Sequence, residues 1–161
     1  MTFFKLIKAI NYRQIVSLFK FLLRHPVLMI ATIKATIKTM KIVQDKFPNL
    51  HGLDNKENAF RHALWNYLIA LRCFEKESEI SKIISWTKEI TDWHEDFSPN
   101  KPLARAMDLH NNYVGRALFL DSCDPVNLDV VKELDLKMKK AIQIASIKEL
   151  KDNITNLVFI K

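Results

Sequence analysis

Apolar residues recur every three or four positions along most of the chain, which is the spacing of one face of an α-helix. In the segment 12–24 they stand at Ile15, Leu18, Phe19, Leu22 and Leu23. Capping residues such as Ser78 and Asp124 precede new apolar runs. The pattern therefore predicts helices at 12–24, 26–46, 55–76, 79–97, 102–120 and 125–145.

This order of elements predicts an all-α fold, a compact multi-helix domain of about six helices with a basic N-terminal helical pair. We expect a single helical domain over 1–161, in which 1–50 form an amphipathic arm packed on or extending from a core of 51–161. Asp54, followed three residues later by Glu, resembles a capping box for the third helix. Residues 156–160 are expected to form a strand or a docked apolar end.

The charge is concentrated in one segment. Residues 1–50 carry nine Lys and Arg against the single acid Asp45, whereas the whole chain has a net charge of +7. Such asymmetry favours an anionic membrane surface or a phospholipid as partner, and nucleic acid less, because acidic residues balance the rest of the surface. The alternative is that the arm only covers the core. Lys34, Lys38 and Lys41 repeat at helical spacing, and the opposite face of the helix at 26–46 is expected to consist of Met29, Ile30, Ile33, Ile37 and Met40.

The apolar stretch 15–33 contains Lys20 and Arg24, and charges at mid-span are costly, so a transmembrane helix is not expected. No small-residue cleavage site follows it, which argues against a secretory signal peptide. We expect the bacterial cytoplasm of the producing cell, with export by a specialised secretion system left open. Cys73 and Cys123 are expected to be free thiols.

Three segments concentrate the unusual polar chemistry, and each falls inside a predicted helix. They read RHALWN at 61–66, WHE at 93–95, and MDLHNN at 107–112 with Gly115-Arg116 behind. Metal-binding and acid–base groups among large apolar neighbours are costly to bury unless they satisfy one another. We therefore expect the three helices to converge on one polar site.

Imidazole nitrogens and carboxylate oxygens of this kind suit a divalent ion, with Zn or Mn as the expected cofactor. The predicted metal ligands are His62, His94, Asp108 and His110. The predicted catalytic residues are Glu95 as general base, His94 and His110. The predicted substrate-binding residues are Arg61, Asn66, Asn111, Asn112 and Arg116. This set predicts a metal-dependent hydrolase of a phosphoester or ester.

The alternative function is a non-enzymatic helical interaction module. Its His, Asn and Asp side chains would form a structural hydrogen-bond network, and its basic arm would bind a partner or anionic lipid. The sequence contains no Walker or Rossmann glycine motif and no Gly-x-Ser-x-Gly elbow. Nucleotide-cofactor chemistry and a serine hydrolase of the common α/β fold are therefore disfavoured.

The run NAFRHALWNYLIA, the His-Glu pair and MDLHNNYVGR together resemble a poorly characterised bacterial family. The resemblance covers about residues 55–120, and the order of its motifs is specific. That family is associated with secreted or effector-type domains of the polymorphic-toxin kind. The resemblance implies an antibacterial effector with an immunity protein as partner, and the basic arm predicts that this effector is membrane-associated. It also implies a joint role for His62, Asn66, His94, Glu95, Asp108, His110, Asn111 and Asn112.

Overall fold

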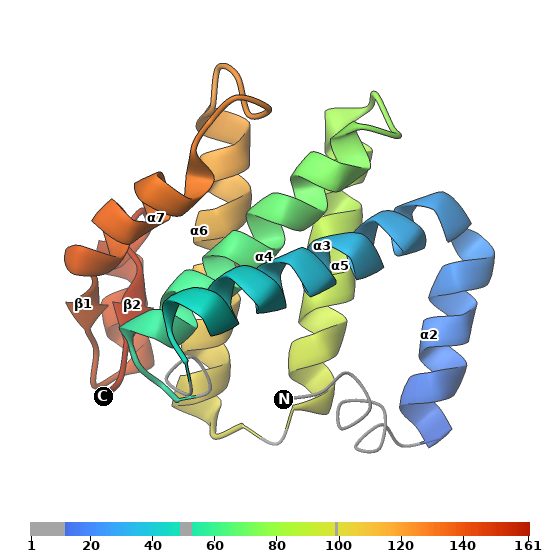
Figure 1. Cartoon of the computed structure of the whole chain (residues 1–161). Helices are drawn as coiled ribbons and strands as arrows, with labels where there is room; N and C mark the ends of the chain where they lie inside the picture. Colours follow the sequence, from blue (N-terminus) through green and yellow to red (C-terminus); the bar gives the residue numbers. More distant parts are fainter. Residues whose placement is uncertain (1–11, 49–52, 99) are drawn as a thin grey trace.

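The computed structural model describes residues 12–48, 53–98 and 100–161, and its elements follow the predicted order (Figure 1). The helices are α2 (Tyr12–Arg24), α3 (Pro26–Lys46), α4 (Lys56–Phe74), α5 (Ile80–Phe97), α6 (Pro102–Asp121) and α7 (Val130–Lys139). A 3-10 helix, η1 (Ile147–Asn153), separates the strands β1 (Ile142–Gln143) and β2 (Val158–Phe159), which pair in parallel. The predicted all-α class is confirmed.

Helix α4 is the central element and packs against α3, α5, α6 and α7. Its apolar residues are buried all around the helix, as expected for an element surrounded by others. They include Phe60, Leu64, Tyr67, Leu68, Ile69 and Cys73. Asn55, not Asp54, caps the helix, because its side chain accepts the backbone N–H of Asn58. The predicted capping box is therefore wrong by one position.

Helices α4 and α6 approach most tightly at Gly115. A Cβ atom at this position would lie 2.2 Å from the backbone oxygen of Ala63. Because that contact is with backbone, no side-chain rotation could relieve it. Gly115 thus sets the distance between the two helices that carry most of the polar motifs.

The helix predicted over 125–145 is shorter than expected. Asp124 closes a turn by accepting the backbone N–H of Asn127, and Asp129 then caps α7 through the N–H of Lys132. Pro125 therefore belongs to a turn and not to the first turn of a helix. At the other end Ile142 has already entered β1.

The C-terminal segment is fixed to α6. Asn111 donates from Nδ2 to the oxygen of Val158 at 2.9 Å and accepts the N–H of Val158 at 3.0 Å. His110 Nε2 lies 3.0 Å from the oxygen of Asn156. The side-chain amide of Asn111 thus binds the backbone of β2 in addition to the pairing with β1. The strand expected in 156–160 is present as Val158–Phe159.

Helix α2 lies antiparallel to α5 at one side of the molecule (Figure 1). Phe21 packs edge-on against Trp86 and Trp93, and Trp93 Nε1 donates to Ser17 Oγ at 2.9 Å. These contacts use one face of α2, and the helix buries no residue completely. None of the helices among the described residues is both long and apolar enough to cross a membrane. Cys73 and Cys123 are free thiols, as predicted.

Candidate metal centre

Two polar stripes face each other across the contact between α4 and α6. Both have the four-residue spacing that places side chains on one face of a helix. The stripe on α4 consists of Asn58, His62 and Asn66, and the stripe on α6 consists of Asp108, Asn112 and Arg116. All six residues are buried, so each polar group needs a partner inside the protein.

Hydrogen bonds join the two stripes in pairs, although Asn58 Oδ1 and Asn112 Nδ2 have no hydrogen-bond partner among the described residues. Asn58 Nδ2 donates to Asp108 Oδ1 at 3.0 Å, and Asn66 Nδ2 donates to Asn112 Oδ1 at 2.7 Å. Arg116 Nη1 donates to Asn66 Oδ1 at 2.7 Å. We call this set of contacts the α4–α6 ladder. It fixes the register of the two helices and the orientation of each side chain in it.

The ladder also determines which nitrogen of His62 carries the proton. A guanidinium only donates, so the amide atom of Asn66 that faces Arg116 must be its oxygen. The nitrogen of Asn66 then faces Asn112, which must present its oxygen in turn. His62 Nδ1 lies 3.0 Å from that same oxygen and must donate to it. In the neutral ring, Nε2 is therefore the nitrogen that carries the lone pair.

His62, Glu95 and Asp108 form a compact group of metal-competent side chains. One ligand atom from each lies within 4.8 Å of the others. His62 Nε2 is 3.3 Å from Asp108 Oδ1, and His62 Nδ1 is 3.6 Å from Glu95 Oε1. The three residues come from α4, α5 and α6 and are only 2%, 1% and 3% exposed. We call them the His–Glu–Asp triad.

Arg61 supplies the positive charge nearest to the triad. Its Nη2 lies 2.8 Å from His62 Nε2, which accepts the hydrogen bond. Burial, together with the charges of Arg61 and His94, holds the pKa of His62 well below its ordinary value. His62 is therefore neutral at physiological pH, the protonation state that a metal ligand requires.

The two carboxyl groups of the triad are buried in surroundings that disfavour their charged, deprotonated forms. Burial, and then the neighbouring Asp108, raise the pKa of Glu95 to about 8. Burial raises the pKa of Asp108 to about 6, although Arg61 and Asn58 act in the opposite direction. Within the described residues Glu95 Oε1 is a buried oxygen with no hydrogen-bond partner. A cation at this point would relieve both features.

The raised pKa values predict how the stability of the metal-free protein depends on pH. Between pH 4.5 and about 8 the folded state keeps a proton on Glu95 that the unfolded chain releases. Asp108 likewise keeps its proton in the folded state between pH 3.8 and about 6. Stability falls with pH wherever the folded state binds more protons. Below their ordinary value of 6.5, the lowered pKa values of His62 and His94 act in the opposite direction. We therefore expect the free energy of unfolding, measured in urea with a chelator present, to decrease from about pH 6.5 towards pH 8, where Glu95 alone of these groups still releases its proton on unfolding.

The Glu95→Gln variant provides the control for this pH dependence, since it lacks the group that titrates last. Its curve should be flat between about pH 6.5 and pH 8, where Glu95 is the remaining one of these groups that still loses its proton. A free energy of unfolding that rises from pH 6.5 to pH 8 in the unaltered protein would contradict the assignment.

Several residues predicted for the site lie elsewhere. His94 is exposed and packs edge-on against Trp65, because α5 turns Glu95 inward and neighbours on a helix diverge by about 100°. His110 and Asn111 bind the C-terminal segment instead of a metal or substrate. Neither His94 nor His110 belongs to the triad.

The predicted substrate-binding residues divide in the same way. Arg116 is buried and directed at Asn66, and Asn66 and Asn112 are occupied within the ladder, so these three orient the site from inside. Of the predicted set only Arg61 lies beside the triad and is half-buried.

Sequence reasoning missed three polar residues that support the triad. Asn58 and Asn100 each donate to one oxygen of Asp108 at 3.0 Å. Thr91 Oγ1 lies 3.2 Å from Asn66 Oδ1. Asn58 precedes His62 by four residues and Thr91 precedes Glu95 by four. Four-residue polar spacing inside apolar helices was therefore the signal that could have found these two.

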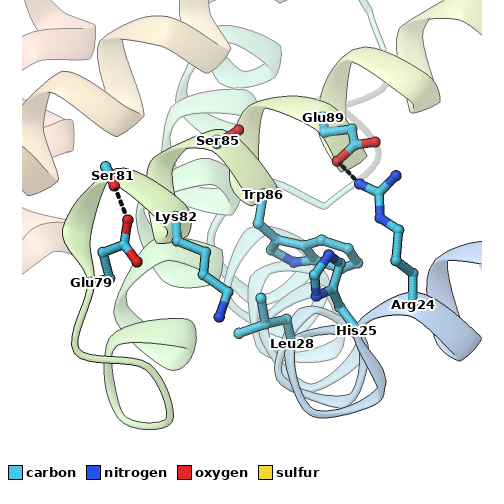
Figure 2. A pocket seen from close by; sticks show the side chains of 9 residues that line it. All are labelled: Arg24, His25, Leu28, Glu79, Ser81, Lys82, Ser85, Trp86 and Glu89. Carbon is cyan, nitrogen blue, oxygen red and sulfur yellow. Dashed lines mark hydrogen bonds and ion pairs between the residues drawn. The ribbon is translucent and has the colours of Figure 1, made fainter.

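A separate surface pocket lies where the α2–α3 bend meets α5 (Figure 2). Arg24 pairs with Glu89 and Lys82 pairs with Glu77, whereas Glu79 accepts a hydrogen bond from Ser81. No residue of the triad or the ladder lines this pocket. The pocket is therefore distinct from the candidate metal centre.

The fold and the site together define an all-α protein with a buried His–Glu–Asp triad between three helices. A family profile described as "Domain of unknown function (DUF6973)" matches residues 19–142, so the chain belongs to this family. No curated protein and no solved structure matches the chain. The matched segment contains the triad and the whole ladder.

Proposed function

We propose that this protein is a metal-dependent hydrolase that acts on a phosphoester or an ester. The observation that carries the proposal is the triad: one nitrogen and two carboxylate groups from three helices, with ligand atoms within 4.8 Å of one another. Glu95 takes the place in the ligand set that was predicted for His94. Its predicted role as general base stays a prediction. Nitrogen and oxygen ligands of this kind favour Zn or Mn.

The surrounding residues have definable tasks in such a site. Asn112 holds the imidazole of His62 so that Nε2 faces the ligand position, and Asn58 and Asn100 hold the carboxylate of Asp108. When bound, the ion would activate a water molecule and polarise the phosphoryl or carbonyl oxygen of the substrate. Arg61 would then turn its guanidinium from His62 to the anionic group of the substrate.

A second candidate function is a non-enzymatic interaction module in which the same residues are purely structural. The observation in its favour is burial, since every member of the triad is nearly inaccessible and Arg61 already supplies a compensating charge. In that case the protein would bind no metal, and substitutions in the triad would act on stability alone.

Metal binding and hydrolysis by the purified full chain separate the two candidates. After chelator treatment we expect a single Zn or Mn site by calorimetry, and metal-dependent hydrolysis of a chromogenic phosphodiester or ester. His62→Ala should lower kcat/KM by more than about 100-fold, because even supporting residues of metal sites have effects of 10- to 100-fold. Circular dichroism would verify that the variant still folds.

His110→Ala is the matched control for this experiment. It also removes an imidazole from α6, but this imidazole hydrogen-bonds to the C-terminal segment and lies outside the triad. The control should keep its metal affinity. Absence of any metal site in the unaltered protein would contradict the metal centre, and equal activity of His62→Ala on a confirmed substrate would contradict its catalytic role.

We further propose that the hydrolase serves as an antibacterial effector, with an immunity protein as partner. This part of the proposal rests on the resemblance of the motifs between residues 55 and 120 to effector-type domains. Growth arrest of a bacterial host that expresses the chain, lost in His62→Ala, would support it.

A further inference from the structure

The outward side of α2 and α3 is apolar to an extent that folding alone does not require. On α2, Phe19 is 58% and Leu23 68% exposed, and on α3 Ile37 is 54% exposed. We call this surface the outer face. Its apolar members are Tyr12, Ile15, Phe19, Leu22, Leu23, Val27, Ile30, Ile33 and Ile37. Leu23 and Val27 place exposed apolar side chains on both sides of the bend between the two helices. Large exposed apolar patches mark interaction sites.

This arrangement contradicts the expectation that the isoleucines of α3 form a face opposite the lysines. The residues of α3 that are buried in the core are Leu28, Met29, Ala31, Thr32, Ala35, Thr39 and Val43. Ile30, Ile33 and Ile37 lie instead on the exposed side, interleaved with Lys34 and Lys38. The reason is the helical period, because positions 30, 33, 34, 37, 38 and 41 share one side.

The charges of the outer face all have the same sign. The described part of the chain from residue 12 to residue 44 contains no acidic residue. Its basic residues are Arg13, Lys20, Arg24, Lys34, Lys38 and Lys41. Arg24 pairs with Glu89, and the other five form no ion pair with any residue that the structure describes. The face therefore combines outward apolar side chains with uncompensated positive charge.

We infer that the outer face docks on an anionic lipid surface. A lipid headgroup layer accepts lysines at its phosphates and apolar side chains at its acyl boundary, so it suits both features together. A second copy of the chain would bring two positively charged faces into contact, and a nucleic acid would leave the isoleucines without a partner. This inference is independent of the metal centre.

Vesicle co-sedimentation of the full chain tests this inference. We expect binding to phosphatidylcholine vesicles with about one third phosphatidylglycerol, weak binding to pure phosphatidylcholine, and a decrease with salt. The double variant Phe19→Ser/Ile37→Ser should bind the anionic vesicles at least about tenfold less tightly. Lys34→Glu/Lys38→Glu should lose affinity to a similar extent.

The matched control is Val126→Ser/Ile154→Ser, which removes two equally exposed apolar side chains outside α2 and α3, at 61% and 54% exposure. It should bind as the unaltered protein does. Equal vesicle binding by Phe19→Ser/Ile37→Ser would overturn the inference. So would a stable dimer that this variant abolishes, or tight binding to an oligonucleotide together with no binding to anionic vesicles.

Discussion

Replacing Glu95 by Gln is expected to change metal affinity and metal-free stability in opposite directions. Gln keeps the shape of the side chain but removes a ligand charge, so the affinity for Zn or Mn should fall by at least about 100-fold. In the chelated protein at pH 8 the same change should raise the melting temperature. It removes a buried carboxyl group whose pKa is raised to about 8 by burial and by Asp108.

This opposition distinguishes a functional cluster from a structural one, because active sites commonly reduce the stability of the protein that carries them. Calorimetric titration measures the affinity, and thermal unfolding with a chelator measures the stability. Asp96→Asn is the control, since Asp96 is the next residue on α5 and lies exposed beside Arg105. A lower melting temperature of Glu95→Gln together with unchanged metal titration would favour the structural network.

Replacing Gly115 by Ala is expected to destabilise the fold severely. In an ordinary helix interior this change stabilises by about 0.5–1 kcal/mol. Here the new Cβ atom would lie 2.2 Å from the backbone oxygen of Ala63, so α4 and α6 would have to separate and the ladder would open. We expect a loss of about 3 kcal/mol or more, at the upper end of overpacking effects.

Urea denaturation of the Gly115→Ala variant measures this loss, and the sign of the change alone is informative. Ala117→Gly, two residues along the same helix, calibrates the intrinsic propensity effect in the opposite sense. A Gly115→Ala protein as stable as the unaltered chain would mean that α4 and α6 do not depend on this contact for their distance.

The helical architecture could be predicted because it depends on local patterns. The periodic apolar positions of α2 and α5, and prolines such as Pro26 and Pro102 at helix starts, are properties of short segments. The error at 125–145 has the same origin. The sequence pattern of a capping residue followed by proline is the same at the start of a helix and in a turn. Only the hydrogen bonds of Asp124 show that this pattern forms a turn here.

Which residues belong to the site depends on how each helix is rotated about its own axis, and the sequence of a short segment does not determine that rotation. His94 and Glu95 are neighbours, so only one could face the interior, and the packing of α5 directs the stripe of Thr87, Thr91 and Glu95 inward. His110 lies on a side of α6 that is covered by a segment 46 residues further along the chain. Long-range packing therefore decided what spacing alone left ambiguous.

The α4–α6 ladder has a consequence for how sequences of this family diverge. Each step joins two side chains about 50 residues apart: Asn58 with Asp108, and Asn66 with Arg116. A substitution on one helix leaves a buried donor or acceptor on the other helix without its hydrogen-bond partner, unless a second substitution compensates for the loss. Substitutions at these positions are therefore expected to occur in correlated pairs. The outer face, by contrast, needs only to keep its exposed apolar side chains and its positive charge.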